Sequence, residues 1–344
     1  MTVGELGALL SAGVGSWLLT GLVRGYALRR RILDHPGSRS LHAAPTPRGG
    51  GLAIVVIVLV AAGALGAAGQ LPPGLAPAIL GGGAAVALVG WWDDVAGVTP
   101  GVRAGVHLVA ALWALWWLGG LPSLQVGTTS VSFGHWGWLL GALTIVWAVN
   151  LYNFMDGIDG LAGAETVCVG IGGGVLLLTT GARGQGLLSL VAGAAGAGFL
   201  LWNWAPARVF MGDVGSGFLG FLLGVMAVAS ERTGALPLLV WILLGGVFVV
   251  DATVTLNRRI LRGEQWYAPH RAHGYQRLVQ SGWSHAKVTV AAVLVNLLLF
   301  ILAVSARFRA PLPWMLLAGL ALLAGCYLLI ERRAPMTPRS QPGS

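Results

Sequence analysis

Eleven apolar runs divide the chain into segments of the length that crosses a lipid bilayer. Each run approaches the ~20 residues that a transmembrane helix needs. Because lipid offers no partner for backbone amides, such runs are expected to be helical. They lie at 3–23, 50–69, 75–92, 104–121, 138–152, 162–181, 185–204, 215–230, 236–256, 286–305 and 312–330. The pattern predicts an all-α polytopic membrane protein with about eleven transmembrane helices.

The composition supports a membrane protein. Hydrophobic residues make up 56% of the chain and charged residues 10%, whereas a soluble domain carries about a quarter charged residues. Small residues let membrane helices approach closely, and the chain has 54 glycines. Cys168 and Cys326 both fall in apolar runs, which favours packed thiols over a disulfide or a metal pair. The first apolar run lacks the features of a cleavable signal peptide.

Basic residues distinguish the two faces of the membrane. If the spans alternate, 17 of the 21 Lys and Arg residues lie on the side of the first loop and four on the other side. By the positive-inside rule that first side is cytoplasmic, so the N-terminus is outside and the C-terminus cytoplasmic. An even number of spans would put the arginine-rich tail outside. The net charge of +9 therefore reflects topology and attraction to membrane lipids, and no nucleic-acid partner is expected.

The aspartates all fall on the cytoplasmic side of this topology. They lie in cytoplasmic loops or at cytoplasmic helix ends, which predicts a polar site assembled from several loops. The seven are Asp34, Asp93, Asp94, Asp156, Asp159, Asp213 and Asp251. The loops are 24–49, 92–103, 150–161, 205–215 and 257–285. Residues 1–333 are expected to form one integral-membrane domain, and residues 334–344 a disordered cytoplasmic tail.

The stretch from Asn150 to Leu161 concentrates polar side chains between two apolar runs. Asn153, Asp156 and Asp159 are spaced three residues apart, and Asn150 lies three residues earlier. On a helix they form one polar stripe, and around the glycines of this stretch they break into a loop. Such oxygen ligands suit Mg²⁺ or Mn²⁺. The alternative is a capping and turn role, because Asp-Gly is a turn signal.

Two further segments place carboxylates at helix ends. Asp93 and Asp94 end the third run, and paired carboxylates there need a cation, a shared proton or water; the alternative is a solvated helix end. The segment from Phe210 to Gly217 is a glycine-rich turn that enters the next helix. It offers amides to an anion and Asp213 as a hard ligand, and the alternative is Asp213 as an N-cap.

The last candidates belong to the ninth run and the loop after it. Asp251 lies inside that run, where a carboxylate indicates either a site or a structural pair with a nearby arginine. His270, Arg271 and His273 lie in the loop, and guanidinium and imidazole groups suit phosphate oxygens. The alternative is a basic loop that holds lipid headgroups. Together the segments predict Mg²⁺-dependent chemistry on a phosphate or diphosphate, with one substrate in the lipid.

Four motifs in this order resemble those of the polyprenyl-phosphate N-acetylhexosamine-1-phosphate transferases, glycosyltransferase family 4. They are Asp93-Asp94, Asn150-x-x-Asn153-x-x-Asp156-Gly-x-Asp159-Gly-Leu, Phe210-Met-Gly-Asp213-x-Gly-Ser and His270-Arg-x-His273. The resemblance runs from Pro45-Thr-Pro-Arg-Gly-Gly-Gly to Arg277 and is greatest for the O-antigen branch. Two features depart from the family pattern. Val95-Ala96-Gly97 follows the aspartate pair without the further charged residue that some members have, and the triple histidine of the muramyl branch is absent. Both departures argue against a peptidoglycan-precursor enzyme.

The resemblance implies a reaction and a set of roles. A UDP-N-acetylhexosamine and undecaprenyl phosphate would give undecaprenyl-diphosphate-sugar and UMP, at the cytoplasmic face of a bacterial inner membrane, with Mg²⁺ or substituting Mn²⁺. Phe210 would stack on uracil, Asp159 and the Gly157 backbone would read its edge, and Asp156 would lie near ribose or diphosphate. The implied catalytic residues are Asp93, Asp94, Asp156 and His270; the substrate-binding residues are Phe210, Asp159, Gly157, Asn150, Arg271, His273 and Asp251; the metal ligands are Asp213 and Asn153.

Alternatives remain open for the mechanism and for the class of protein. A lipid phosphate with a second pKa near ~6 is mostly dianionic at neutral pH, which favours direct attack on the β-phosphate over an aspartyl-phosphosugar intermediate. A transporter of a phosphorylated or lipid-linked sugar would also have many spans and intramembrane charge, and a non-catalytic scaffold is a third reading. The sugar and the oligomeric state, including a homodimer, are open.

Overall fold

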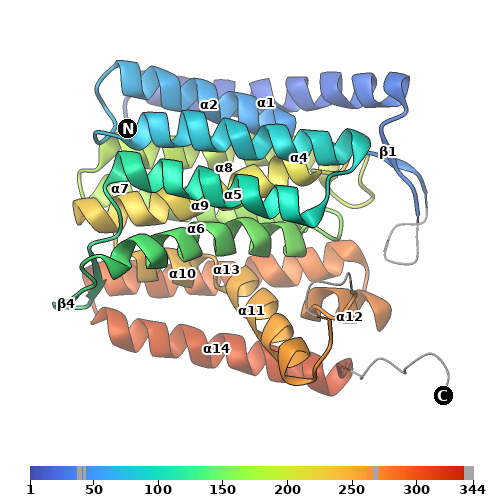
Figure 1. Cartoon of the computed structure of the whole chain (residues 1–344). Coiled ribbons are helices and arrows are strands. Elements are labelled where there is room, and N and C mark those ends of the chain that lie inside the picture. The colour runs from blue at the N-terminus through green and yellow to red at the C-terminus, as the bar shows by residue number, and fades with distance from the viewer. Residues whose placement is uncertain (37–40, 42–43, 266–269, 337–344) are drawn as a thin grey trace.

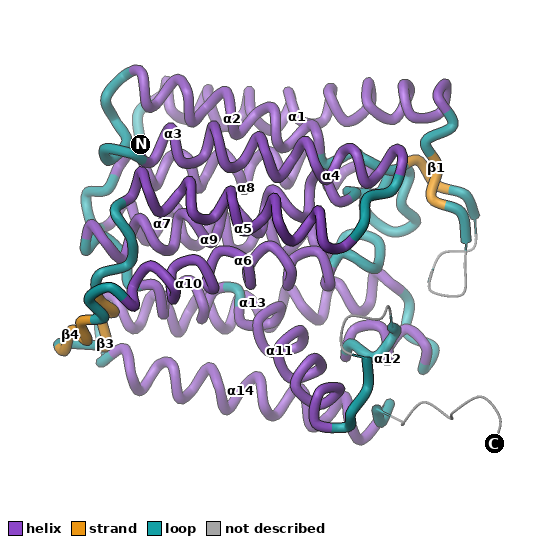
Figure 2. Tube along the Cα trace, viewed as in Figure 1, coloured by secondary structure: helices purple, strands orange, loops and turns teal. Residues whose placement is uncertain are grey.

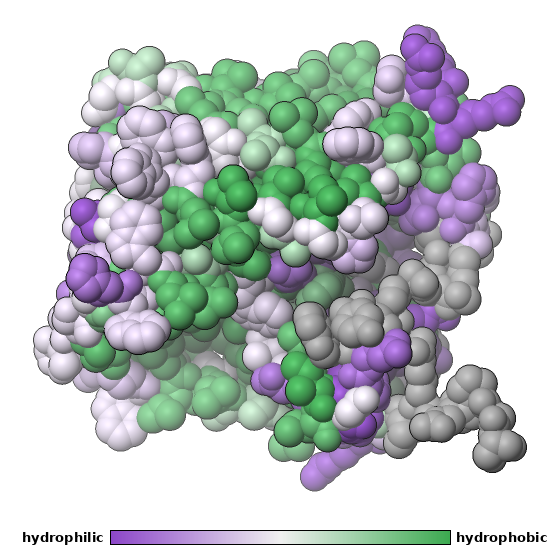
Figure 3. Space-filling view, in the orientation of Figure 1, coloured by the Kyte–Doolittle hydropathy of each residue, from purple (hydrophilic) through white to green (hydrophobic). Residues whose placement is uncertain are grey.

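The computed structural model describes residues 1–36, 41, 44–265 and 270–336. Its long helices lie side by side in one bundle, and the chain reverses direction from one helix to the next (Figure 1). The connecting loops therefore gather at the two ends of the bundle (Figure 2). Apolar side chains predominate over the middle of the visible surface, and strongly hydrophilic ones gather chiefly toward the right-hand end (Figure 3).

Each predicted span coincides with a helix or with a broken helix. The helices are α1 (Val3–Arg30), α2 (Leu52–Ala67), α3 (Leu75–Pro77), the π-helix η1 (Ala78–Gly83), α4 (Ala84–Ala96), α5 (Pro100–Leu118), α6 (Trp136–Met155), α7 (Leu161–Thr179), α8 (Arg183–Asn203), α9 (Asp213–Thr233), α10 (Leu238–Leu244), α11 (Gly246–Leu261), α12 (Gly274–Gln280), α13 (His285–Phe308) and α14 (Leu312–Arg333). Within the described residues, nine helical segments are long and apolar enough to cross a membrane, with α3, η1 and α4 counted as one; α2 is shorter, and α10 and α11 form a bent pair. The prediction of an all-α polytopic membrane protein is confirmed.

The ninth predicted span is not one straight helix. It breaks at Gly245 into α10 and α11, whose axes differ by 84°. Paired glycines are a recognised cause of such breaks, and Gly245 precedes Gly246 here. In Figure 1, α11 leaves the direction of the other long helices and leads toward the short helix α12, which the hydrophobic pattern did not predict.

Two small β-hairpins occupy the bundle ends. Strand β1 (Leu33–Asp34) pairs antiparallel with β2 (Thr46–Pro47) at the end where α4 and α6 finish. Strand β3 (Ser123–Val126) pairs with β4 (Thr129–Ser132) at the other end. Glu231 holds the second hairpin, because its Oε1 accepts from the Gln125 amide at 2.6 Å and its Oε2 from the Leu238 amide at 2.6 Å. Residues 334–336 continue from α14, and the rest of the predicted tail lies outside the described residues.

Helix α9 lies at the centre of the bundle and packs through glycines. In its most apolar stretch 89% of the residues are buried, as expected for a helix that is apolar on all sides. A Cβ added to Gly90 of α4 would lie 2.6 Å from the Val214 amide nitrogen. The absence of a side chain at Gly90 therefore lets the end of α4 meet the first residues of α9.

We predict that Gly90→Ala destabilises the protein by about 1–3 kcal/mol, the usual cost of overpacking. Gly105→Ala is the matched control, because a Cβ at Gly105 of α5 has no neighbour within 4 Å. Alanine there is expected to stabilise the helix by about 0.5–1 kcal/mol. Thermal unfolding of the purified variants in detergent measures both; equal midpoints for the two variants would contradict the close approach of α4 and α9.

Candidate active site

The segment before α2 pairs with the loop between α8 and α9. The Phe210 amide donates to the Pro47 carbonyl at 2.8 Å, the Gly50 amide to the Phe210 carbonyl at 2.9 Å, and the Gly51 amide to the Met211 carbonyl at 2.9 Å. A side chain at Gly51 would lie 2.9 Å from the Met211 oxygen. Gly50 and Gly51 are thus required by this backbone pairing, which brings Arg48 beside the start of α9.

The first amides of α9 are bound by Asp94. Its Oδ1 accepts from the Asp213 amide at 2.9 Å and its Oδ2 from the Val214 amide at 3.2 Å. The Asp94 side chain has no accessible surface. The glycine-rich turn was predicted to offer its amides to a bound anion; these two instead hold a carboxylate of the chain. Nor is Asp213 the N-cap, because that position belongs to Gly212.

Two arginines neutralise the three carboxylates at this junction. Arg48 Nη2 lies 2.7 Å from Asp94 Oδ1 and 3.5 Å from Asp213 Oδ1. Arg103 Nη1 lies 2.7 Å from Asp93 Oδ2 and 2.6 Å from Asp213 Oδ2. Of the cation, shared proton or water that the aspartate pair was expected to need, the structure places a cation beside each aspartate. Burial lowers the pKa of Arg48, but Asp94 and Asp213 raise it more, so the net shift is upward and the guanidinium stays charged.

Helix α6 delivers the two asparagines and ends before the aspartates. Asn153 Nδ2 donates to Ser216 Oγ of α9 at 3.2 Å, while Asn150 Nδ2 donates to the Val146 carbonyl of its own helix at 2.8 Å. The helix stops at Met155, so the predicted polar stripe is half helix and half loop. Asp156, at the C-cap, has a pKa raised to about 8, first by burial and then by the charges of Asp213 and Asp94.

Asp159 connects this stretch to two other elements. Its Oδ2 accepts from the Ala207 amide at 3.0 Å, and its Oδ1 lies 3.3 Å from His285 Nδ1 at the start of α13. The Thr289 hydroxyl donates to the Asp159 carbonyl at 3.1 Å. Asp159 is therefore fixed between the loop that carries Phe210 and α13, and its predicted contact with uracil stays a prediction.

A second carboxylate binds the first amides of a helix in the loop after α11. Asp251 Oδ1 accepts from the Gly274 amide at 2.7 Å and Oδ2 from the Tyr275 amide at 3.1 Å, while His273 Nδ1 lies 3.6 Å from Oδ1. The structural partner expected for Asp251 was a nearby arginine; it is the N-terminus of α12 instead. The Asp251 side chain is 12% exposed and that of His273 4%, so both are placed to position the loop.

The histidine loop lies against the stretch at the end of α6. The His270 and His273 rings are 4.8 Å apart, and the His273 ring is 6.0 Å from that of Phe154. The Tyr275 hydroxyl donates to the Phe154 carbonyl at 3.0 Å and occupies the space that a side chain at Gly157 would need. Arg271 is half-buried in the same loop.

The site residues form two groups that share the stretch at the end of α6. One group contains Asp93, Asp94, Asp213 and Asn153; the other contains His270, His273 and Asp251. Sequence reasoning missed several residues that hold these groups in place: Arg48, Arg103, Asn203, Ser216, Tyr275 and His285. Both arginines counted toward topology, and Arg48 also belongs to the Pro45–Gly51 stretch of the resemblance, but neither was assigned to the site. Their position on the same face as the aspartates was a usable signal. Asn203, whose Oδ1 accepts from the Gly160 amide at 3.0 Å, carries no motif signal.

Comparisons with known proteins identify the family of the chain. The family model of glycosyl transferase family 4 matches residues 76–231. A probable undecaprenyl-phosphate N-acetylglucosaminyl 1-phosphate transferase of Bacillus subtilis (strain 168) is 31% identical over 306 residues, which cover 84% of this chain and 80% of the relative. The decaprenyl-phosphate N-acetylglucosaminephosphotransferase of Mycobacterium tuberculosis (strain ATCC 25618 / H37Rv) is 31% identical over 366 aligned positions, covering 93% and 87%.

A phospho-N-acetylmuramoyl-pentapeptide-transferase of Synechococcus elongatus (strain ATCC 33912 / PCC 7942 / FACHB-805) is 30% identical over 328 residues, covering 86% of this chain and 84% of the relative. The chain belongs to the polyprenyl-phosphate hexosamine-1-phosphate transferases, glycosyl transferase family 4. It is a multi-pass membrane protein of this transferase family. The resemblance seen in the motifs is confirmed at the level of the family.

We predict that Arg48→Gln destabilises the protein by roughly 3 kcal/mol, the lower end of the range for breaking a buried ion pair, because Asp94 is inaccessible and Arg48 is 28% exposed. Thermal unfolding of the variants measures the loss. Arg29→Gln, an exposed arginine at the end of α1, is the control. In a protein that already carries Asp94→Asn, the Arg48→Gln change should lower stability by less than it does in the wild type. If the stability losses of the two single variants simply add in the double variant, the pairing is contradicted.

The pKa of Asp156 generates a pH prediction. Its folded-state pKa is about 8, whereas an unfolded aspartate titrates near ~3.9. Between these values the folded protein retains a proton that the unfolded chain has lost, so this group makes stability fall as pH rises from about 4 to 8. Unfolding midpoints measured across that range with a chelator should show a shallower decline in Asp156→Asn. Parallel profiles would contradict the raised pKa.

Proposed function

We propose that the protein transfers an N-acetylhexosamine 1-phosphate from a UDP-sugar to undecaprenyl phosphate and releases UMP, as the initiating step of an O-antigen-like surface polysaccharide. The observation that carries the proposal is the convergence of Asp93 and Asp213 on one guanidinium at the end of an apolar bundle. The relatives from Bacillus and Mycobacterium are named as transferases that act on polyprenyl phosphates. These names support the reaction class. The absence of a triple histidine near His270 favours this branch over the muramyl one.

The charges at the bundle ends support a cytoplasmic site in a bacterial inner membrane. The aspartate junction and the basic segments lie at the same end, while Arg183 begins α8 and Arg232 ends α9 at the other end. With 15 of the 19 basic residues that the structure describes at the aspartate end, the positive-inside rule puts that end in the cytoplasm and the N-terminus outside.

The residues present fit a magnesium ion that is bound together with substrate. Among the described residues no three His, Cys, Asp or Glu side chains form a ready-made metal cage. Mg²⁺ needs no such cage, because it is usually held by one or two carboxylates, waters and substrate phosphates. Asp213 would be the main ligand and Asn153, which faces α9 through Ser216, the second; Mn²⁺ would substitute. The ion would supply positive charge to the diphosphate.

The different exposure and contacts of the two adjacent aspartates support different tasks for them. Asp94 has no accessible surface and binds α9 and Arg48, so its contribution is to position Asp213. Asp93 retains 13% exposure and is the member that can contact the acceptor phosphate. A dianionic lipid phosphate needs little base catalysis; Asp93 orients it or takes a residual proton.

In the proposed transfer a lipid phosphate oxygen attacks the β-phosphorus of the UDP-sugar. The new phosphorus–oxygen bond forms the lipid diphosphate, and the bond to the UMP oxygen breaks, so UMP leaves with the electron pair. Phe210, Asp159 and the Gly157 backbone bind uracil, with Asp156 near ribose or diphosphate. His270 and Arg271 bind the sugar or diphosphate, and the loop 262–280 sets the choice of sugar.

The test is release of UMP by the purified protein, incubated with undecaprenyl phosphate, Mg²⁺ and a panel of UDP-N-acetylhexosamines. We expect one sugar to support turnover, and Asp93→Asn or Asp213→Asn to lower kcat at least ~100-fold, as for loss of a group that stabilises transition-state charge. Asp34→Asn, a carboxylate of β1 at the same end, is the control and should retain activity.

Three outcomes would overturn parts of the proposal. No UMP release with any sugar, but movement of a lipid-linked sugar across vesicles, would favour a transporter. An intact polysaccharide in cells that carry Asp213→Asn would favour a scaffold. A phosphosugar trapped covalently on Asp93 would replace direct attack by an aspartyl intermediate.

A further inference from the structure

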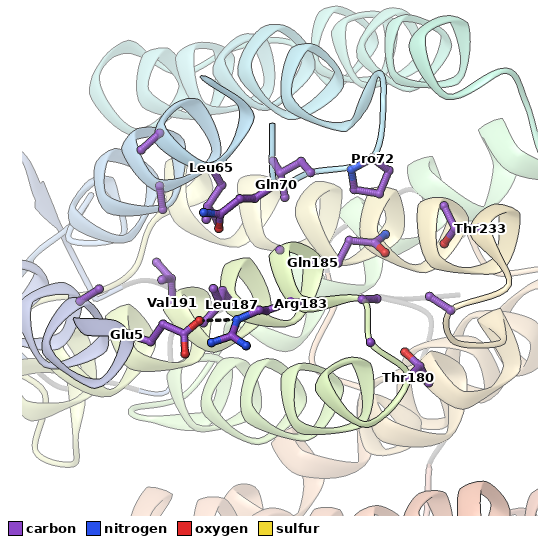
Figure 4. A pocket seen from close by; sticks show the side chains of 18 of the residues that line it. Glu5, Leu65, Gln70, Pro72, Thr180, Arg183, Gln185, Leu187, Val191 and Thr233 are labelled. Atoms are coloured by element: carbon purple, nitrogen blue, oxygen red, sulfur yellow. Dashed lines mark hydrogen bonds and ion pairs between the residues drawn. The ribbon is translucent and has the colours of Figure 1, made fainter. Parts of the chain in front are cut away.

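A cavity of about 1050 Å³ lies at the end of the bundle opposite the aspartates. Its wall comes from the start of α1, the end of α2 and the turn after it, the turn between α7 and α8, and the turn after α9. Figure 4 shows the Glu5–Arg183 pair, which bridges α1 and α8 in this cavity. Gln70 and Gln185 are among the other residues that line it. The volume is at the upper end of the range for small-molecule sites.

Gln185 lines the cavity with an unsatisfied polar group. The residue is 1% exposed, and its Nε2 is a buried atom that has no hydrogen-bond partner within the described part of the chain. A buried N–H group without a partner destabilises the folded protein, because its hydrogen bond to water is lost and not replaced. Because the amide lines a cavity, a hydrogen-bond acceptor bound there would remove this destabilisation.

A cationic group lies in the same wall. Arg183 Nε donates to Glu5 Oε1 at 2.7 Å, and the Thr2 amide donates to Glu5 Oε2 at 2.7 Å. This bond uses one of the five guanidinium N–H groups, and 57% of the Arg183 side chain is exposed. The planar guanidinium fork matches the oxygens of a phosphate. Arg183 and Gln185 are two positions apart on α8, where side chains do not face each other, so the cavity offers a phosphate-binding group and a donor amide at separate points of its wall.

The remaining wall is mostly apolar and belongs to helices that span the membrane. Leu9 of α1, Leu65 of α2, and Leu187 and Val191 of α8 line it. A free phosphate ion would gain nothing from these side chains, whereas an acyl chain would lose contact with water and gain contact with them. Polar donors at one side and aliphatic side chains at the other are complementary to an amphiphile with a phosphate headgroup.

We propose that this cavity binds one glycerophospholipid, with its phosphate at Arg183, another of its oxygens at the Gln185 amide, and an acyl chain along Leu9, Leu65, Leu187 and Val191. The cavity is remote from the aspartate junction. Helix α8 begins at Arg183 in the cavity and ends 20 residues later at Asn203, which binds the Gly160 amide. At 1.5 Å per residue these ends are about 30 Å apart. The bound lipid therefore joins α1, α2 and α8 and touches neither substrate.

The experiment uses the full-length protein, purified and delipidated in detergent. Dioleoylphosphatidylglycerol is titrated, and the unfolding midpoint and the bound mass by native mass spectrometry are recorded. Dioleoylglycerol, which lacks the phosphate, and glycerol 3-phosphate, which lacks the acyl chains, are the two comparison ligands. The variants are Gln185→Leu, Arg183→Gln and, as control, Arg309→Gln, which removes the same charge from an exposed residue at the same end.

The wild type and Arg309→Gln are expected to retain one phosphatidylglycerol and to unfold at a higher midpoint when it is bound. Dioleoylglycerol and glycerol 3-phosphate should each raise the midpoint less. Gln185→Leu and Arg183→Gln should each bind about tenfold more weakly. Gln185→Leu also removes the unpaired amide, so its lipid-free midpoint should equal or exceed that of the wild type. If Gln185→Leu does not fold, Arg183→Gln carries the test.

Four results would overturn the proposal. An equal midpoint shift in wild type and both cavity variants would show that the lipid acts elsewhere, with water satisfying Gln185. An equal shift by dioleoylglycerol would remove the role of the phosphate, and an equal shift by glycerol 3-phosphate would make the site one for free phosphate. If Arg309→Gln also lost lipid binding, the lipid would be attracted by the positive charge of this end of the protein as a whole, and not by a specific site.

Discussion

The Asp94 carboxylate at the N-terminus of α9 is the interaction on which the rest of the site depends. A buried carboxylate is stable only if its charge is compensated, and here the two first amides of α9 and Arg48 share that task. The positive end of the helix dipole adds to the compensation. Because Asp94 holds α9 in place, Asp213 and Asp93 come close enough to share Arg103. The close approach is permitted by Gly90, which adds no side chain between α4 and α9.

The same solution appears a second time in the structure. Asp251 of α11 takes the first two amides of α12, as Asp94 of α4 takes those of α9. In each case a carboxylate from a membrane helix fixes the start of another helix, and the residues around that start belong to a motif. A polar group in an apolar bundle is costly unless paired, so the helix starts and the carboxylates satisfy each other. This pairing leaves Asp93, Asp213 and the His270 loop as the groups that face outward from two fixed junctions.

The short stretch at the end of α6 connects the two junctions. Asn153 reaches α9 through Ser216, and the Phe154 carbonyl receives the Tyr275 hydroxyl from α12. Beyond the helix end, Asp159 is held by the Ala207 amide and His285. Four parts of the chain thus meet around about ten residues, and a shift of α6 along its axis would alter both groups of site residues together. This is the structural basis for treating the two groups as one site.

The hydrophobic pattern by itself determined where the apolar helical segments lie and in what order, and with them the end of the bundle at which each motif lies. The reason is local: a helix in lipid must satisfy its own amides and needs about 20 apolar residues. The motif spacing also identified the family. The pairings of Asp94 with Arg48 and of Asp213 with Arg103 were decided only by the tertiary structure, because the partners lie 46 and 110 positions apart in sequence. The break at Gly245 and the helix α12 were likewise decided by packing, since two glycines permit a bend of 84° but do not require one.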